Sequence, residues 1–429
     1  MEHHPVEQVF FYIPQMFQAL RYDVAGYVEH FTLKTAKSSQ LFEHQINWNM
    51  NANKPDPLKP KLDSVITKIT TGLSGSDLDF YKREFKFFAE VTGISGKLKP
   101  FIKKSKAEKK KKIDEEMRKI DVEVGVYLPS NPESIVVDID RDSGRPLQSH
   151  AKTPFMATFK VQSAEDDNKS TEPKTAWQSS IFKVGDDCRQ DVLALQLISI
   201  FKSIIEKSGL DVYLYPYRVV ATDCGCGVIE VIPRSISRNM MGREKVNSLP
   251  NYFSEKLKKH FVRSLAACSV VLFLISIKDR HNGNIMFDDQ GHTVHIDFGF
   301  ILDIAPGGIE FEASPDGSAA YNLFSDLVVN RAWPFGEIES SLRIQMVALM
   351  LDSGFPCFKG EGSIKKLRSK LRLDLDHKKA AKFMLAQIHK SHENQFSRLY
   401  DRFQNIQNSI PFLSQSIESE LSHFYYEIW

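Results

Sequence analysis

The sequence KDRHNGNIM at residues 278–286, followed by HIDFG at 295–299, decides the fold of this chain. It supplies an aspartate (Asp279), an asparagine five positions later (Asn284) and a second aspartate within a DFG triplet (Asp297). A phosphoryl-transfer site needs these groups: one carboxylate for the attacking hydroxyl, and an amide and a carboxylate for the metal ions that bridge the ATP phosphates. A polar loop and an ordinary hairpin can carry a DFG triplet alone, but both motifs at this spacing favour the phosphoryl-transfer site.

The residues between the two motifs predict a β-hairpin. Residues 285–287 and 293–296 read as two short strands, and DDQG at 288–291 is typical turn sequence. A hairpin would bring Asn284 and Asp297 side by side, as two ligands of a metal ion require.

The catalytic loop contains two candidate proton acceptors. Asp279 is the first candidate for orienting the attacking hydroxyl, and His281 is the second, because an unperturbed imidazole pKa near 6.5 suits proton transfer at cellular pH. The sequence does not divide the role of the base between them. Arg280 is expected to hold the loop.

These motifs resemble those of the phosphatidylinositol 3-/4-kinase superfamily. Other segments narrow the resemblance to its type III alpha phosphatidylinositol 4-kinases: FYIPQ (11–15), YLPSNP (127–132), IFKVGDDCRQD (181–191), YPYRVVAT (215–222) and GVIE (227–230). The resemblance extends from about residue 10 to about residue 412. It implies an α+β, two-lobed protein-kinase-like fold, with an antiparallel β small lobe, a mainly helical large lobe and an N-terminal α-helical accessory domain. It also implies ATP-dependent phosphorylation of phosphatidylinositol at the inositol 4-hydroxyl.

The resemblance also implies roles for residues of the small lobe. Lys183, on a predicted strand, should contact the ATP phosphates as a positive clamp. Asp191 should help to order the site together with Tyr217. The roles of Asp186 and Asp187 stay open, since a simple turn explains them equally well.

The remaining contacts with the nucleotide are also implied by the resemblance. QSHAKTP at 148–154 is similar to the family's phosphate-covering loop, in which Ser149 and backbone N–H groups would cap the phosphates. The backbone of Glu230 and Val231 should hydrogen-bond adenine. Asn284 and Asp297 are expected to bind Mg²⁺, with Mn²⁺ as the alternative.

The pattern of residue types along the sequence changes three times, which predicts four domains. Residues 1–96 carry apolar side chains at three- and four-residue spacing, which predicts a helical accessory domain. A basic linker follows at 97–120, then a strand-rich kinase N-lobe at 121–232, and finally a mainly helical C-lobe at 233–429. In the N-lobe, one helix (191–207) interrupts strands predicted at 122–127, 134–138, 155–161, 176–184 and 212–221.

The basic linker is the most charged part of the chain. Lys97 to Lys112 holds nine lysines and one acidic residue. Blocks of like charge repel and stay solvated, so a flexible linker is favoured. A patch facing anionic lipid is the alternative.

Composition limits the class of protein and its location. Lys+Arg 56 against Asp+Glu 54 gives a net charge of +2, so no nucleic-acid partner is indicated. Five scattered cysteines make no zinc spacing and suit a reducing compartment. No secretory signal is visible, and the most apolar run, 265–277, is too short to span a bilayer. We therefore expect a cytoplasmic enzyme, peripheral at membranes; the resemblance implies the plasma membrane, and regulatory or scaffold proteins bound through the helical domain. Because family members are much larger, a fragment is expected.

One segment departs from the family. Residues 300–330 contain no Lys or Arg but five acidic residues, and the expected headgroup-binding stretch is replaced by ASPDGSAA at 313–320. An acidic loop should not attract an anionic lipid. The alternative function is therefore a nucleotide-binding module with impaired lipid kinase activity, and a protein serine/threonine kinase is a third candidate. At the C-terminus, 413–429 has a helical apolar face for core packing or membrane contact.

Overall fold

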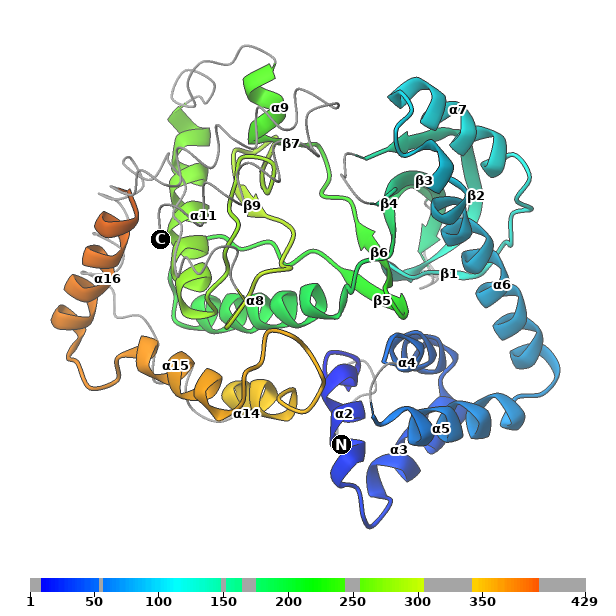
Figure 1. Ribbon diagram of the computed structural model, residues 1–429, viewed down its shortest axis with the longest axis horizontal. Coiled ribbons are helices and arrows are strands. Elements are labelled where there is room, and N and C mark those ends of the chain that lie inside the picture. The colour runs from blue at the N-terminus through cyan, green and yellow to red at the C-terminus, as the bar shows by residue number, and fades with distance from the viewer. Residues whose placement is uncertain are drawn as a thin grey trace, which may run out of the picture. The chain divides into compact units, whose positions relative to one another are not determined.

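The computed structural model describes residues 9–53, 57–147, 152–163, 175–243, 255–304 and 342–392 (Figure 1). Three predicted features lie outside these ranges: Ser149, the replaced stretch at 313–320 and the C-terminal apolar face at 413–429. The chain forms two compact units. The first unit comprises 1–199, 216–232 and 341–361, and the second comprises 200–215, 233–340 and 362–429.

The first unit begins with helices, as the apolar spacing predicts. They are α2 (Ile13–Ala19), the 3-10 turn η1 (Leu20–Tyr22), α3 (Tyr27–Ser38), α4 (Gln40–Ala52), α5 (Lys59–Gly72) and α6 (Gly75–Lys97). Phe17, Phe42 and Leu62 are fully buried in one cluster, so α2, α4 and α5 share a core. Removing such large side chains from water is the main free-energy gain of this helical region.

The first unit also contains an antiparallel six-stranded sheet, in the order β1-β2-β3-β4-β6-β5. Its strands are β1 (Tyr127–Leu128), β2 (Asn131–Pro146), β3 (Phe155–Ser163), β4 (Thr175–Val184), β5 (Val219–Asp223) and β6 (Cys226–Glu230). On β3, Phe155, Ala157 and Phe159 are buried and alternate with half-buried residues, as expected for a strand with one core face.

Two predicted strands start later than expected. The strand predicted at 212–221 begins only at Val219, because Pro216 cannot donate a hydrogen bond to a ladder. The strand predicted at 122–127 begins only at Tyr127, because Gly125 adopts φ +90 and breaks the extended backbone. The predicted strands at 155–161 and 176–184 and the predicted helix at 191–207 are confirmed.

The predicted flexible linker is wrong for Lys106–Met117, which form helix α7. Ser105 and Glu108 make a capping box, in which each side chain accepts a hydrogen bond from the other's backbone N–H. Ile113 and Met117, four residues apart, are fully buried against the sheet. The helix lies so close to β2 that a Cβ at Gly144 would come within 2.5 Å of Ile113 Cγ2. Apolar burial on one face therefore orders a segment whose charge alone predicts disorder.

The second unit is mainly helical around a small sheet in the order β7-β8-β9. Its elements are β7 (Ser235–Ser237), α9 (Arg238–Arg243), α11 (Glu255–Leu274), β8 (Ile285–Asp288), β9 (Thr293–His295), most of α15 (Glu361–Leu371) and α16 (His377–His392). β8 and β9 pair antiparallel, which confirms the predicted hairpin. Helix α8 (Arg189–Lys207) runs from the first unit into the second, and α14 (Leu342–Leu349) belongs to the first. No helix in the described ranges is both long enough and apolar enough to cross a bilayer.

A buried polar cluster joins α4 and α6 to the start of the sheet. His44 Nδ1 on α4 lies 2.6 Å from Glu84 Oε2 on α6, with both side chains fully buried. Glu84 Oε1 accepts a 3.1 Å hydrogen bond from the backbone N–H of Tyr127. Glu43 lies in the same region and accepts a hydrogen bond from Asn47. Burial and the charge of Glu84 raise the pKa of Glu43 to about 8.

Glu43 should make the stability of the first unit fall as pH rises. Its carboxyl is protonated in the folded chain up to about pH 8 but ionises near pH 4.5 in the unfolded chain, so stability is lost between these values. Glu43→Gln keeps an acceptor for Asn47 and removes the ionisation. We expect it to stabilise the chain by at least about 1 kcal/mol more at pH 8 than at pH 5, measured by urea unfolding. The exposed Glu90→Gln serves as a control, and equal effects of the two variants would contradict the assignment.

Candidate active site

Lys183 projects from the middle of the six-stranded sheet. It lies on β4, between β3 and β6, and pairs with Gly227. The preceding Phe182 is fully buried on one face, so the alternation of a strand directs Lys183 to the other face. Its side chain is 20% exposed, and Nζ lies 3.7 Å from Asp186 Oδ2. The structure thus gives Asp186 a contact with the predicted phosphate clamp.

The side chain of a second lysine lies over the turn after β4. Gly185 has φ +94, and its N–H donates to the carbonyl of Gly225 at 2.7 Å. The side chain of Lys152 lies over this glycine, and a Cβ there would come within 2.9 Å of Nζ. The sequence reasoning gave Lys152 no role of its own. It was the only cation of the predicted phosphate-covering loop apart from a histidine, which is the signal that could have identified it.

Helix α8 begins in a network centred on Arg189. Its guanidinium binds both carboxylate oxygens of Asp187, and its Nη1 donates to Asn53 Oδ1 of α4 at 3.2 Å. It also stacks on Phe355, 4.8 Å from the ring centroid. Burial favours a raised pKa for Asp187, but the hydrogen bonds and charge of Arg189 hold this pKa below its usual value. Asp187 therefore anchors the start of the helix that carries Asp191.

The two residues predicted to order the site are both buried in the first unit. Asp191 lies in the first turn of α8, and Tyr217 lies shortly before β5. A buried carboxylate needs partners that compensate its lost hydration. The position of α8 therefore determines which groups can compensate the lost hydration of the Asp191 carboxylate.

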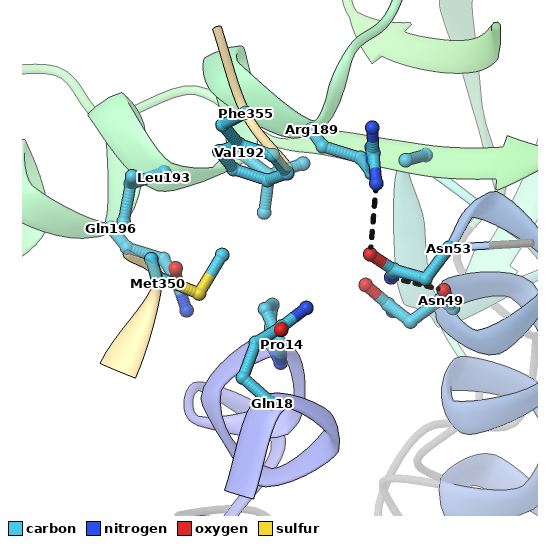
Figure 2. A pocket seen from close by; sticks show the side chains of 11 residues that line it. Pro14, Gln18, Asn49, Asn53, Arg189, Val192, Leu193, Gln196, Met350 and Phe355 are labelled. Atoms are coloured by element: carbon cyan, nitrogen blue, oxygen red, sulfur yellow. Dashed lines mark hydrogen bonds between the residues drawn. The ribbon is translucent and has the colours of Figure 1, made fainter. Parts of the chain in front are cut away.

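A reciprocal amide pair fixes α8 to the accessory helices. Gln15 Nε2 on α2 donates to Gln196 Oε1 at 2.9 Å, and Gln196 Nε2 donates back to Gln15 Oε1 at 3.1 Å and to the carbonyl of Phe11. Both side chains are buried. Figure 2 shows a cavity that Gln196 helps to line, with the bond from Arg189 to Asn53 on one side. The accessory helices and α8 are therefore joined by specific buried hydrogen bonds.

The catalytic loop fixes Asn284 so that its oxygen is left for a ligand. Asn284 is buried, its backbone N–H donates to the carbonyl of His281 at 2.8 Å, and Nδ2 donates to the carbonyl of Asp279 at 2.9 Å. Nδ2 is therefore held by the loop, and Oδ1 is the atom of the amide that can coordinate a cation. Asp279 itself is half-buried and has φ +60, an uncommon value for a residue other than glycine.

The hairpin brings the DFG motif back to Asn284, as the sequence predicts. Ile285 pairs with His295, and the N–H of Ile296 donates to the carbonyl of Asn284 at 3.0 Å. Asp297 follows directly with φ +61 and an exposed side chain. In the described ranges, no group of three or more His, Cys, Asp or Glu side chains could hold a metal ion. An amide and a carboxylate oxygen suit an ion that takes its other ligands from phosphates and water.

Two buried cations tie the catalytic loop to the DFG segment. Arg280 is 3% exposed, and it donates to the carbonyls of Lys278 at 2.8 Å, of Ile296 at 2.6 Å and of Asp297. Lys278 donates from Nζ to the carbonyl of Leu302 at 2.6 Å and to that of Ile304 at 3.0 Å. Arg280 thus holds the loop as predicted, whereas the sequence reasoning missed Lys278.

His281 is oriented by the loop itself. Its Nδ1 accepts a 2.9 Å hydrogen bond from the backbone N–H of Gly283. A Cβ at Gly283 would come within 2.7 Å of Cε1, so the glycine lets the ring lie over the chain. Because Nδ1 is an acceptor, a neutral His281 carries its proton on Nε2, which is then a donor.

The predicted adenine-binding backbone lies at the end of β6. The N–H of Glu230 donates to the carbonyl of Arg218 at 2.9 Å, and that of Val231 donates to Ser179 at 3.4 Å. The second bond is long and weak. The amide of Glu230 is therefore already used, and Val231 keeps the more available N–H.

Two family models match this chain. The model for phosphatidylinositol 3- and 4-kinase matches residues 177–256 and 250–350, and that for the phosphoinositide 3-kinase family accessory domain (PIK domain) matches residues 1–82. Phosphatidylinositol 4-kinase alpha 2 of Arabidopsis thaliana is 35% identical over 424 residues, which cover 89% of this chain and 78% of that protein. The chain belongs to the phosphatidylinositol 3- and 4-kinase family.

Fungal members of the family are more similar. Phosphatidylinositol 4-kinase stt4 of Schizosaccharomyces pombe is 50% identical over 467 residues, covering 96% of this chain and 25% of that protein. Phosphatidylinositol 4-kinase STT4 of Saccharomyces cerevisiae is 53% identical over 450 residues, covering 96% of this chain and 24% of that protein. The chain thus spans about a quarter of the length of these two relatives. The predicted superfamily, its alpha type and the predicted fold class are confirmed.

Arg280→Met should disrupt the site of this family member. The change leaves the carbonyls of Lys278, Ile296 and Asp297 without their donor, and a buried unpaired polar group costs about 1–3 kcal/mol. We expect a loss of at least about 3 kcal/mol in unfolding free energy and faster amide exchange over 279–297. The control is Arg263→Met, whose ion pair with Asp211 is 38% exposed on the arginine side and should be worth less than about 1 kcal/mol. Equal losses in both variants would contradict this role.

The amide pair should behave as a unit. Gln15→Leu or Gln196→Leu leaves the other buried amide short of a partner, at a cost of about 1–3 kcal/mol. The double variant removes both amides and should cost less than the sum of the single changes. A double-mutant cycle of unfolding free energies measures this coupling, with Gln162→Leu at the end of β3 as a control. Additive effects would show that the pair does not couple α2 to α8.

Proposed function

We propose that this chain is the catalytic region of a phosphatidylinositol 4-kinase, which transfers the γ-phosphate of ATP to the inositol 4-hydroxyl of phosphatidylinositol. The observation that carries the proposal is the placement of Asn284 beside the DFG aspartate, on a loop that also holds Asp279. The names of the relatives support the substrate: both fungal proteins are called phosphatidylinositol 4-kinases.

Membership of a kinase family implies ATP and a divalent cation. Asn284 Oδ1 and the Asp297 carboxylate would hold the cation, and we propose Mg²⁺ rather than Mn²⁺ because both ligands are hard oxygen donors. When bound, the ion would offset negative charge on the phosphates. Lys183 and Lys152 would contact the phosphates, since Lys183 lies near the end of β4 and Lys152 lies over the turn that follows it.

The remaining predicted residues take supporting roles in the proposal. The N–H of Val231 and the carbonyl of Glu230 would bind adenine, since the N–H of Glu230 is occupied by Arg218. Asp191 and Tyr217 would order the site from buried positions, with Asp191 held in place by α8. Ser149 stays a predicted phosphate contact.

Asp279 is the proposed base. In the reaction the 4-hydroxyl oxygen attacks the γ-phosphorus, the bond to the bridging oxygen of ADP breaks, and the hydroxyl proton passes to the Asp279 carboxylate. His281 would instead donate a hydrogen bond from Nε2 to an oxygen of the transferring group. The support is the N–H of Gly283, which occupies the Nδ1 lone pair.

The setting of the proposed reaction is a membrane surface, with the enzyme bound peripherally. The helical accessory region is proposed to bind regulatory or scaffold proteins. The acidic segment at 300–330 motivates the competing function, an ATP-binding module without lipid kinase activity. The names of the relatives do not favour this ATP-binding module.

The deciding experiment is transfer of labelled γ-phosphate to phosphatidylinositol in mixed micelles, alongside ATP binding. Product phosphorylated at the 4-position, absent with Asp297→Ala, would support the proposal. ATP binding without lipid product would favour the nucleotide-binding module. Phosphorylation of a peptide panel in place of the lipid would indicate a protein kinase.

Asp279→Asn and His281→Gln should separate the base from the donor. Asp279→Asn keeps the size of the side chain but removes the proton acceptor, so kcat should fall by at least about 100-fold with little change in ATP affinity. His281→Gln keeps an N–H donor and should cost about tenfold or less. Steady-state kinetics on phosphatidylinositol micelles measures both. A severe His281→Gln variant with a mild Asp279→Asn variant would assign the base to His281.

A further inference from the structure

Helix α11 ends in a turn whose conformation usually requires glycine. The N–H of Ile277 donates to the carbonyl of Leu272 at 2.9 Å. The N–H of Ser276 donates to the carbonyl of Phe273 at 3.3 Å, and the two bonds form a Schellman motif. The motif places Ser276 in the left-handed region, with φ +52, where a residue with a Cβ costs free energy. Asp279, the proposed base, follows shortly after, so the start of the catalytic loop depends on this turn.

Lys370, in the last turn of α15, binds this turn from a distant part of the chain. Its Nζ donates to Ser276 Oγ at 2.5 Å and to the carbonyl of Phe273 at 3.0 Å, and it lies 5.0 Å from the centroid of the Phe273 ring. The serine is only 4% exposed. Because the carbonyls at the end of a helix carry partial negative charge, a cation is favoured there. The bonds from Lys370 therefore help to offset the free-energy cost of the left-handed serine.

The same turn is hydrogen-bonded to the segment that follows the DFG motif. The N–H of Lys278 donates to the carbonyl of Phe300 at 2.9 Å. The N–H of Leu302 donates to the carbonyl of Ile275 at 3.0 Å. One of the two paired segments leads to the proposed base and the other follows the proposed metal ligand, so a shift of the turn would displace both groups. We call the paired segments the catalytic junction: residues 275–278 and 300–302.

Helix α15 contacts this region near its other end as well. Ser363, which is 3% exposed, donates from Oγ to the carboxylate of Asp303, the residue after the catalytic junction. Ser363 and Lys370 are about two helical turns apart and therefore lie on one face of α15. Leu367 is buried on this face between them. A single helix face thus binds both segments of the catalytic region, one at each end.

We propose that Lys370 is a positioning residue for phosphoryl transfer, which acts through Ser276 to hold the catalytic junction in place. The inference rests on the proposed function, because it concerns the alignment of the proposed base and the proposed metal ligand. Phosphoryl transfer depends on positioning, and a displacement of about 1 Å can cost about 100-fold in rate. The left-handed Ser276 is the point at which the loss of Lys370 would be felt.

Steady-state kinetics of the full chain on phosphatidylinositol micelles tests the proposal. Lys370→Met removes both hydrogen bonds and the charge, so kcat should fall at least about tenfold, while the KM values for ATP and lipid should change by less than about twofold. The control is Lys365→Met, at an exposed position on the same helix, which should keep the wild-type kcat. Equal kcat values for the two variants would overturn the inference.

Substitutions at Ser276 separate positioning from a general loss of stability. Ser276→Ala and Ser276→Gly both remove the hydroxyl that Lys370 binds, but only glycine adopts the left-handed conformation without the penalty of a Cβ. Ser276→Ala should lower kcat by at least about threefold, and Ser276→Gly should bring the kcat of Lys370→Met to within about threefold of wild type. A double variant as slow as Lys370→Met would contradict the role of Ser276. If Lys370→Met does not fold, equal kcat values for Ser276→Ala and Ser276→Gly would contradict it instead.

Amide exchange over residues 275–304 tests the inference independently of the substrate. Exchange should be faster in Lys370→Met than in Lys365→Met, and Ser276→Gly should slow it again in the double variant. Equal exchange in the two lysine variants would overturn the inference. A wild type that makes no phosphatidylinositol 4-phosphate would overturn the proposed function, and the exchange measurement would then still decide whether Lys370 holds the catalytic junction.

Discussion

The buried guanidinium of Arg280 is the interaction on which the catalytic segments depend. Asp279 and Asp297 both have left-handed backbone conformations that cost free energy for residues with a Cβ. Such conformations persist only where surrounding contacts determine them. Arg280 supplies these contacts by donating to carbonyls on both segments at once. The unusual backbone of each aspartate is therefore stabilised by the same side chain, which couples the proposed base to the proposed metal ligand.

A comparable coupling joins the accessory helices to the sheet within the first unit. Gln15 and Asn53 bind α8 near its start, while Glu84 binds the backbone of Tyr127 in the first strand. These contacts are buried and polar, so they specify geometry that apolar packing alone leaves open. The helical region is thus a structural part of the unit that carries Lys183. A partner that displaced α2 from α8 would act on the surroundings of Asp191.

Local pattern was sufficient for the elements whose signals lie within a few residues. The hairpin, the long α8 and the central strands follow from periodicity and turn chemistry. Helix α7 did not, because a charge run predicts solvation unless one knows which lysines find carboxylates. Lys119 reaches Glu116 from outside the run and Lys97 from its first position, and Ile113 packs into a core that includes residues of β2. The capping box at Ser105 was the only local sign of the helix.

The candidate site, too, could be predicted from the sequence only where local patterns fix the geometry. Sequence placed Asn284 and Asp297 together, because a hairpin fixes their register. It could not divide the base role, since the protonated nitrogen of His281 depends on the N–H of Gly283, a contact set by the path of the loop. It also missed Lys278, whose partners are the backbone carbonyls of Leu302 and Ile304, which carry no sequence signature. Lys152 was missed because its approach to Gly185 depends on the fold.

The composition of the acidic segment after the DFG motif bears on the proposed substrate. Residues 300–330 contain no Lys or Arg, so electrostatic attraction to an anionic leaflet cannot originate there. A substrate without phosphates on its inositol ring does not require cations at the ring. The lipid surface around it does favour them. The absence of Lys and Arg from this segment is therefore compatible with the proposed substrate, and any electrostatic attraction to the lipid surface would have to come from other parts of the protein.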